Sequence, residues 1–482
     1  MTVVDLQRAT PLQPPLCVDL DGTLIASDLL LESFMLLLKR NPLYLFLVPV
    51  WLLKGRAQLK SEIASRVTLN PAALPYNKPF IEWLQAEQSS GRSLWLCTAA
   101  DTTLATAVAA HLGIFDGVIA SDGTTNLAGT AKANVLVERF GKGGFDYCGN
   151  ELRDLHIWKV GRGAVIVRGP RDLERKVSPS VTVLRSFPKT SGGLRSIVRA
   201  LRPHQWAKNI LVLVPFAAAH RVGIGASITF GILAMIAFCL CASSVYVLND
   251  LLDLEADRGH HRKSRRPFAA GDVSILTGLL LAPALLAGAI VITLFLPLKF
   301  DLVLLAYYVL TVAYSFRLKG IVLIDALALA GLYTLRVIGG AAAVLVPLSF
   351  WLLLFSVFLF LSLAFVKRFA ELDALRRQQR LRAAGRGYHI EDLSMLQSLG
   401  TASGYLSVLV LALYINSPEI SSLYGRPKVI WMLCVLMLYW VSRVWMVAQR
   451  GEMHDDPVVF ALKDRMSIAI GVLAAITVAV AV

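Results

Sequence analysis

Three regularly spaced aspartates directly after a long apolar run are the most informative side chains of this chain. The apolar run covers residues 230–248, and Asp250, Asp253 and Asp257 follow it in the sequence NDLLDLEADR, which begins at Asn249. Their i, i+3, i+7 spacing predicts that they share one face of a helix. Like charges on one face repel unless a cation holds them, and hard oxygen ligands suit Mg²⁺. The sequence therefore predicts a magnesium site at the mouth of a membrane helix; the alternative is a solvated helix end.

A cationic loop extends this candidate site. It reads HHRKSRRP and begins at His260, so that it includes Lys263 and Arg266. Cationic side chains beside carboxylates suit a multiply charged anion that is held through a metal ion. The acids bind Mg²⁺, the metal binds a diphosphate, and lysine or arginine neutralises the remaining phosphate oxygens.

Further polar side chains recur inside apolar segments downstream. The sequence Tyr314–Lys319 is followed by Asp325 and Arg336 within an apolar stretch, where an unpaired charge is costly. Asp325 and Arg336 either form a structural ion pair with each other or face the same polar cavity as the aspartates. A third set, at 367–371, is either functional or made of charges that reach the membrane surface.

Composition favours a membrane protein with a soluble part. The chain has 482 residues, of which 56% are hydrophobic, and its mean hydropathy is +0.61. Residues 1–205 are typical of a soluble domain, whereas later residues form successive apolar windows long enough to span a bilayer. We predict nine spans, at 208–224, 228–249, 274–294, 299–316, 321–343, 347–366, 400–416, 428–448 and 465–482. The six cysteines are expected to be buried free thiols.

The distribution of basic residues predicts the topology. Lysine and arginine concentrate in the loops after the second, fourth and sixth predicted spans. By the positive-inside rule these loops are cytoplasmic, together with the N-terminal domain and both candidate active sites. We therefore expect a multi-pass protein of the cell inner membrane. Topology and anionic ligands account for the net charge of +15, so no nucleic-acid partner is expected.

The C-terminal motifs together resemble the decaprenyl-phosphate phosphoribosyltransferase branch of the UbiA-type intramembrane prenyltransferases. Besides the aspartates, the resemblance includes RPxQWxKN with Lys208, the extension DRxHxxKxxRP after Asp257, and YSxxLK before Asp325. It implies nine helices and transfer of 5-phosphoribose from phosphoribosyl diphosphate to a polyprenyl phosphate. Asp325 stands alone where the family has its second acidic motif.

The resemblance also implies roles for individual residues. The Mg²⁺ ligands would be Asn249, Asp250, Asp253 and Asp257, and the three aspartates would be catalytic. The substrate-binding residues would be Lys208, Asn249, Arg258, His260, Lys263, Arg266, Tyr314, Lys319, Asp325 and Arg336. The rival reading within the superfamily is transfer of a prenyl chain to an aromatic acceptor. A rival of another class is a solute transporter with a soluble regulatory domain.

The N-terminal part carries a second signature. An apolar strand ends in Asp19 and Asp21 within the sequence DLDGT, and a second buried strand ends at Thr98. Lys132 and Asp154 follow downstream. In a doubly wound sheet the carboxyl ends of the strands form the ligand site. This order of motifs resembles the haloacid-dehalogenase-like phosphohydrolases over residues 12–175.

This second resemblance implies a Mg²⁺-dependent phosphatase. Asp19 would attack phosphorus, and Asp21 would act as general acid and base. Thr98 and Lys132 would bind the phosphoryl group, and Asp154 would hold Mg²⁺ with Asp19. Asn150 replaces the usual acid at the start of the fourth motif, which lowers the negative charge of the site.

The predicted organisation is a fusion of two domains. An α/β doubly wound, haloacid-dehalogenase-like phosphatase domain covers residues 1–175. It includes an apolar cap insertion at 27–84 whose helices lie either at the membrane interface or in a buried hairpin. A basic linker covers 176–205, and an all-α polytopic transferase domain covers 206–482. We expect the transferase to make polyprenyl-phosphoryl-5-phosphoribose and the phosphatase to remove its 5-phosphate, which gives an arabinofuranose precursor for cell-envelope synthesis.

Overall fold

The computed structural model describes residues 13–189, 192–218, 225–378, 386–417, 425–453 and 456–481. The chain forms two compact units. The first unit contains Met1–Leu201 and Val247–Leu281, and the second contains Arg202–Tyr246 and Ala282–Val482. The aspartate-rich segment therefore belongs to the same unit as the N-terminal domain.

A six-stranded parallel sheet is the centre of the first unit, as predicted for its fold class. The strand order is β3-β2-β1-β4-β5-β6, so the chain turns from one side of β1 to the other between β3 and β4. The strands are β1 (Leu16–Val18), β2 (Leu94–Asp101), β3 (Gly117–Ser121), β4 (Asp146–Gly149), β5 (Gly163–Val167) and β6 (Thr182–Phe187). The carboxyl ends of β1, β2 and β4 therefore meet at one edge of the sheet.

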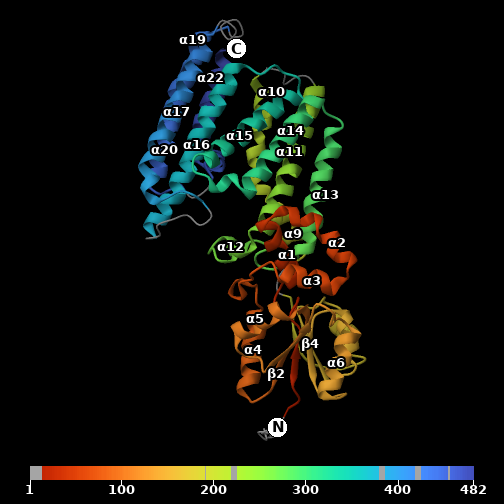
Figure 1. Cartoon of the computed structure of the whole chain (residues 1–482). Helices are drawn as coiled ribbons and strands as arrows, with labels where there is room; N and C mark the ends of the chain where they lie inside the picture. Colours follow the sequence, from red (N-terminus) through yellow and green to blue (C-terminus); the bar gives the residue numbers. More distant parts are fainter. Residues whose placement is uncertain are drawn as a thin grey trace. The chain divides into compact units, whose positions relative to one another are not determined.

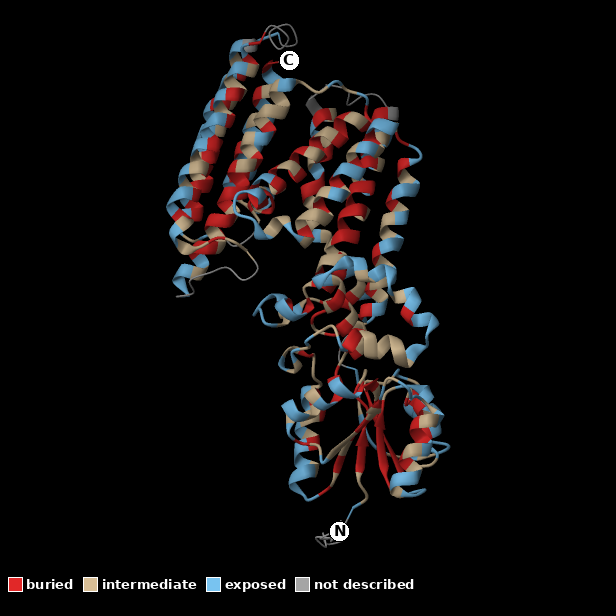
Figure 2. Ribbon diagram, viewed as in Figure 1, coloured by how far each residue is buried: buried red, intermediate tan, exposed pale blue. Residues whose placement is uncertain are grey.

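Helices cover both faces of this sheet. Side chains alternate along a strand, so Leu16 and Val18 pack with α4 (Lys78–Ser89) and α5 (Thr102–Leu112). Cys17 packs instead with α6 (Thr130–Phe140) and α7 (Leu155–Trp158). Figure 1 shows α4 and α5 on one face and α6 on the other, and Figure 2 shows that the central strands β1, β4 and β5 are buried. Helix α8 (Leu173–Val177) packs on the same face as α6 and α7, and α9 (Leu194–Ala200) follows β6 in the sequence.

The sheet continues beyond the predicted domain boundary at 175. The segment 176–205, predicted to be a linker, contains β6, which pairs with β5 in parallel. As an edge strand, β6 exposes most of its side chains and lacks the apolar signature by which the buried strands are recognised.

The insertion after β1 is helical. It consists of α1 (Leu29–Arg40), the 3₁₀ turn η1 (Pro42–Phe46), α2 (Val48–Leu53), α3 (Arg56–Ala64) and η2 (Pro71–Ala73). Asp28 caps α1 by accepting a hydrogen bond from the backbone N–H of Leu31. Leu37, Trp51 and Ile63 form a small core among these helices.

In the described residues, seven helices are long and apolar enough to cross a membrane. They lie in α11 (Gly225–Leu252), α13 (Ile275–Thr293), α14 (Leu298–Phe316), α15 (Ile324–Ala343), α16 (Phe350–Arg377), α17 (Leu393–Ile415) and α20 (Met432–Gln449). An eighth span is possible in α21 (Pro457–Lys463) and α22 (Arg465–Ala481), which are bent by 77°. The predicted count of nine is thus not confirmed.

The predicted first span, at 208–224, has a different structure. It begins in a 3₁₀ helix, η4 (Pro203–Leu213), and continues into α10 (Val214–Ala218); its remainder lies outside the described residues. Pro215 lacks the N–H that a continuous helix would use. Gly340 of α15 packs against this segment so closely that a Cβ there would lie 1.9 Å from the carbonyl oxygen of Val212.

Candidate functional site

The three predicted aspartates do not lie on one uninterrupted helix. Helix α11 ends at Leu252, and Asp253 takes a non-helical conformation before α12 (Leu254–Arg258) begins. Asp250 is consequently on one helix, Asp253 at the break and Asp257 on the next helix. The predicted common face is broken, but the bend still brings Asp250 and Asp257 to a common partner.

That partner is Arg266, which follows the short turn η5 (Lys263–Arg265). Its Nη1 atom donates to Asp250 Oδ1 at 3.1 Å and to Asp257 Oδ2 at 2.5 Å. Both carboxylates are buried, so each would be costly without a nearby positive charge. One nitrogen of a cationic group thus lies between two carboxylates. A divalent cation in the same place would have oxygen ligands from both carboxylates.

The third aspartate has a different partner. Asp253 Oδ1 accepts from Lys39 Nζ of α1 at 3.0 Å. Among the described residues, no group of three or more His, Cys, Asp or Glu side chains is arranged to hold a metal ion. In this conformation the predicted ligands therefore form ion pairs with arginine and lysine.

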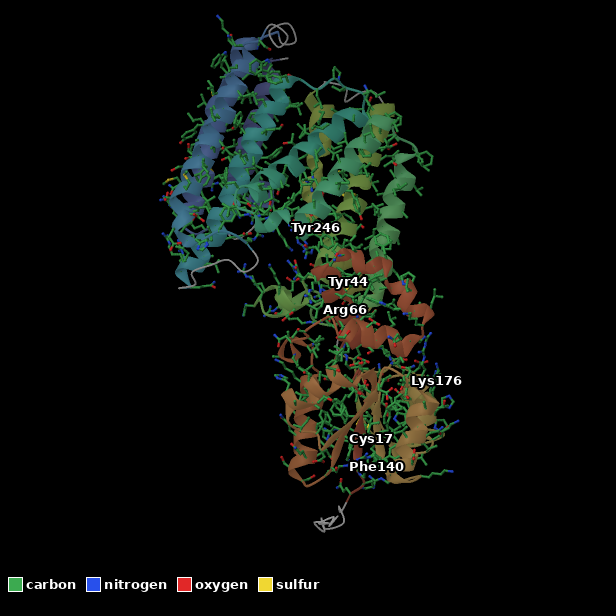
Figure 3. All side chains as sticks on the ribbon, viewed as in Figure 1. Cys17, Tyr44, Arg66, Phe140, Lys176 and Tyr246 are labelled. Carbon is green, nitrogen blue, oxygen red and sulfur yellow. The ribbon has the colours of Figure 1, made fainter. Side chains whose placement is uncertain are left out.

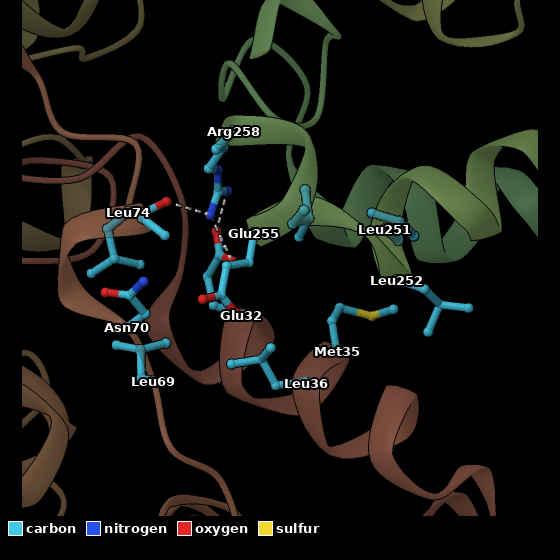
Figure 4. Close-up of a pocket in the computed structure, with 12 residues that line it drawn as sticks. Glu32, Met35, Leu36, Leu69, Asn70, Leu74, Leu251, Leu252, Glu255 and Arg258 are labelled. Carbon is cyan, nitrogen blue, oxygen red and sulfur yellow. Dashed lines mark hydrogen bonds and ion pairs between the residues drawn. The ribbon is translucent and has the colours of Figure 1, made fainter. Parts of the chain in front are cut away.

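Arg258, predicted to bind substrate, is held by the cap insertion. Its Nη2 and Nη1 atoms donate to Glu32 Oε1 at 2.6 Å and Oε2 at 3.1 Å. Its remaining donors reach the carbonyl oxygens of Ala73 and Ala269. Figure 4 shows this pair at the wall of a small pocket that also includes Met35 of α1. Arg258, the last residue of α12, therefore connects the aspartate-rich segment to the cap.

The other predicted residues of this loop are more accessible. His260 and Lys263 are exposed, and Asn249 is half-buried. The Nδ1 atom of His260 accepts a hydrogen bond from the backbone N–H of Arg262 at 3.2 Å, which fixes the start of the basic turn.

In the second unit, Asp325 and Arg336 do not form the ion pair considered above. Asp325 is fully buried, and its oxygens contact Arg368 Nε and Tyr388 Oη, both at 2.5 Å. Arg368 also donates to Tyr314 Oη at 2.9 Å, so two predicted residues share this arginine. Lys319 lies on the adjacent turn η6 (Leu318–Gly320) and is half-buried.

Arg336 belongs to a separate buried network. Its Nε and Nη2 atoms donate to Asn209 Oδ1 and Tyr307 Oη, both at 2.8 Å. Its Nη1 atom donates to the carbonyl oxygen of Leu332 at 2.7 Å. The guanidinium is therefore surrounded by neutral acceptors and carries a buried positive charge.

Lys208 lies beside a carboxylate that sequence reasoning missed. Asp456 Oδ2 accepts from Lys208 Nζ at 2.8 Å and from Lys367 Nζ at 2.9 Å, and Tyr333 Oη donates to Oδ1 at 3.0 Å. Asp456 belongs to no motif; the only signal was an aspartate before Pro457, which is typical of a helix N-terminus.

In the N-terminal domain, the predicted catalytic residues gather at the carboxyl edge of the sheet. Lys132 Nζ donates to Asp19 Oδ1 at 2.7 Å and to Tyr147 Oη at 2.9 Å. Thr98 is buried on β2. Asp154 lies beyond β4, where its Oδ2 atom accepts the backbone N–H groups of Asn150 and Glu151 at 2.9 and 3.0 Å. Parallel strands thus bring together groups that are up to 135 residues apart in the sequence.

This site carries more negative than positive charge. Burial and the nearby charge of Asp19 raise the pKa of Asp154 to about 7. Burial, together with Asp28 and Asp19, raises the pKa of Asp21 well above its usual range. Burial alone would lower the pKa of Lys132, but Asp19 and Asp154 raise it instead. These carboxyl groups would be stabilised by a further cation, and their hard oxygens are suitable ligands for Mg²⁺.

Asn150, the departure from the expected motif, lies against the turn after β1. Gly22 has a φ of +72°, and a Cβ on it would lie 2.2 Å from Asn150 Nδ2. The amide is therefore packed at the mouth of the site, and Gly22 is needed both for the turn and for the close approach.

Lys60 is a cation at this site that sequence reasoning missed. It comes from α3 of the cap, and its Nζ atom donates to the carbonyl oxygen of Ala99 at 2.5 Å and to Asn126 Oδ1 at 2.8 Å. Burial lowers the pKa of this ammonium group, and the charges of Asp21 and Asp28 oppose that effect. No motif marked it; its place in the cap insertion was the only signal.

Known proteins match different shares of the chain. A sequence model of the UbiA prenyltransferase family matches residues 210–469. The uncharacterized protein y4nM of Sinorhizobium fredii is 38% identical over 98% of this chain and 92% of its own length. Its similarity therefore includes the N-terminal part.

Two other relatives match a smaller share of the chain. The nodulation protein NoeC of Azorhizobium caulinodans is 36% identical, and a decaprenyl-phosphate phosphoribosyltransferase of Mycolicibacterium smegmatis is 31% identical. Each match covers 56% of this chain and 87% of the relative. A solved UbiA homolog from Archaeoglobus fulgidus, bound to GPP and Mg²⁺, covers 59% of this chain and 98% of its own, with 18% identity and a TM-score of 0.46.

Proposed function

The chain belongs to the UbiA prenyltransferase family and is a multi-pass membrane transferase, and we propose that it transfers 5-phosphoribose from phosphoribosyl diphosphate to a polyprenyl phosphate. The observation that carries this proposal is the convergence of Asp250 and Asp257 on Arg266. It is supported by the similarity to a decaprenyl-phosphate phosphoribosyltransferase over 87% of that relative.

The diphosphate group of the ribosyl donor is proposed to bind to the acidic segment and its basic loop. Asp250, Asp253 and Asp257, with Asn249, would hold Mg²⁺, which neutralises the charge that develops on the leaving diphosphate. When substrate binds, Arg266 would exchange its carboxylate partners for phosphate oxygens. His260 and Lys263, which are exposed on the same loop, would complete the phosphate-binding surface.

In the reaction itself, a lipid phosphate oxygen forms a bond to the anomeric carbon, and the bond from that carbon to the diphosphate breaks. The ribosyl centre becomes oxocarbenium-like, so positioning and charge stabilisation matter more than a strong base. Lys208, Tyr314, Lys319, Asp325 and Arg336 of the second unit are proposed to bind substrate directly or to fix the residues that do.

We further propose that the N-terminal domain is a haloacid-dehalogenase-like phosphomonoesterase that removes the 5-phosphate from the product. Asp19 Oδ would form a bond to phosphorus while Asp21 donates a proton to the leaving ribose oxygen, and water would then hydrolyse the aspartyl-phosphate. Lys132 and Thr98 would hold the phosphoryl oxygens. Asp19 and Asp154 would hold Mg²⁺.

A transfer assay with labelled phosphoribosyl diphosphate tests the first step. Membranes that contain the full chain, polyprenyl phosphate and Mg²⁺ should form a labelled lipid. Asp250→Asn should lower the rate by at least about a hundredfold, because it removes a charge that holds the metal. Glu255→Gln is the matched control, since Glu255 is an exposed acid of the same segment. Equal loss in both variants, or full activity of Asp250→Asn, would refute the proposal.

A further inference from the structure

The cap of the first unit presents an apolar surface between α1 and α3. Phe46 and Leu53 expose 74% and 89% of their surface. The exposed large apolar side chains of this segment are Leu43, Leu45, Phe46, Leu47, Val50, Leu52 and Leu53. A cluster of this kind is uncommon on a protein surface that faces only water.

This surface is held in place by the other side of the same segment. Trp51 is buried and packs with Leu37 and Ile63. The ring of Tyr44 lies 6.1 Å from that of Trp51, and the guanidinium of Arg66 lies 5.0 Å from the Trp51 ring. Figure 3 labels Tyr44 and Arg66 on this cap. The exposed residues are therefore displayed by a folded element.

The charged residues that flank this segment in the sequence are all basic. Lys39 and Arg40 precede it, and Lys54 and Arg56 follow it; all four are exposed. The sequence contains no aspartate or glutamate from residue 33 to residue 61. An apolar segment between basic side chains is complementary to the surface of an anionic lipid bilayer.

The cap also contacts the residues at the end of α11, which belong to the first unit. Its Lys39 contacts Asp253, the residue directly after the end of α11 at Leu252. Met35 and Leu36 line the same pocket as Leu251 and Leu252. The C-terminal end of α1 therefore lies beside the end of this candidate span, and the apolar segment starts three residues after Lys39.

We propose that Pro42–Leu53 is an interfacial anchor that lies in the headgroup region of the bilayer, with its apolar side chains among the acyl chains. Its twelve residues would reach about 18 Å as a helix, which is too short to cross a hydrocarbon core of about 30 Å. The anchor holds the cap, and with it the sheet edge that carries Asp19, against the membrane surface. This proposal does not depend on either proposed reaction.

Lipid-dependent fluorescence quenching tests the anchor directly. The full chain carries a bimane label at Phe46→Cys or Leu53→Cys and is placed in nanodiscs of anionic phospholipid with or without bromine on the acyl chains. All six native cysteines are buried, so labelling is directed to the new thiol. The control is Ser89→Cys, because Ser89 is exposed at the end of α4, before β2, and so lies at the opposite edge of the sheet.

We expect brominated lipid to quench the labels at 46 and 53 at least about threefold more than the label at 89. Phe46→Ser combined with Leu53→Ser, labelled at Leu45→Cys, should reduce that quenching. Equal quenching at 46, 53 and 89 would overturn the proposal. Label fluorescence that changes with protein concentration and not with bromine would also overturn the proposal, because a second copy of the chain would then cover the surface.

Discussion

Glu32 of the cap helix and Arg258 of the aspartate-rich segment form a buried two-point ion pair, with N–O distances of 2.6 and 3.1 Å. The two residues are 226 positions apart in the sequence. Because α1 also supplies Lys39 to Asp253, one helix of the N-terminal domain holds two positions of the segment that we propose to bind diphosphate. Helix α1 of the N-terminal domain thus helps to hold that segment in place.

Glu32→Ala should destabilise the first unit, because it leaves the Arg258 guanidinium buried without its counter-ion. The loss should be about 3–5 kcal/mol, as for other broken buried ion pairs. Hydrogen exchange at 253–266 should increase. Glu32→Leu with Arg258→Met should recover much of that loss, since the pair is replaced by apolar groups. Unchanged exchange in Glu32→Ala would contradict this role of the pair.

Arg266→Ala should weaken binding of phosphoribosyl diphosphate, because the side chain lies between the two carboxylates proposed to hold its metal. We expect KM for phosphoribosyl diphosphate to rise at least about tenfold, the usual scale for a charge-assisted contact. Arg262→Ala is the control from the same exposed loop. A steady-state assay over a range of Mg²⁺ concentrations measures the effect, and identical KM values in both variants would disagree with it.

Lys60→Met should lower phosphomonoesterase activity about ten- to a hundredfold, because it removes a half-buried cation that interacts electrostatically with Asp21. Lys54→Met, at an exposed cap lysine, should have no effect. Burial lowers the pKa of Lys60, so its charge is present at low pH and is lost as pH rises, at a pH below the ordinary lysine range. Lys60→Arg should therefore retain phosphatase activity to higher pH than wild type does. If the activity of both proteins falls over the same alkaline pH range, the proposal is contradicted.

Gly22→Ala should impair the N-terminal site without affecting ribosyl transfer. The added methyl would collide with Asn150, and a φ of +72° is unfavourable for alanine. We expect a loss of about 1–3 kcal/mol in stability and a large fall in phosphatase rate. Thermal unfolding and both assays on one preparation provide the check. Gly113→Ala is the control, because its φ is +64° but no atom lies within 4 Å of the added Cβ.

Local sequence patterns predicted the sheet and most membrane helices because each contains a continuous apolar run of the length typical of its element. They also predicted that Asp19 and Asp154, which follow β1 and β4, lie at one edge of the sheet, since parallel strands bring their ends together whatever the intervening length. They did not predict that Asp253 interrupts a helix, because the i, i+3, i+7 spacing is equally compatible with a continuous one. The partners Glu32, Lys39 and Asp456 were out of reach, since long-range ion pairs leave no periodic signal in a single sequence.

Mass spectrometry of the lipid product tests the central claim, that one chain carries out both steps. Purified enzyme is incubated with phosphoribosyl diphosphate, polyprenyl phosphate and Mg²⁺, and wild type is compared with Asp19→Asn. We expect wild type to yield polyprenyl-phosphoryl-ribose and Asp19→Asn to yield the same lipid with its 5-phosphate retained. Identical dephosphorylated products from both proteins, or no ribosylated lipid from wild type, would contradict the account.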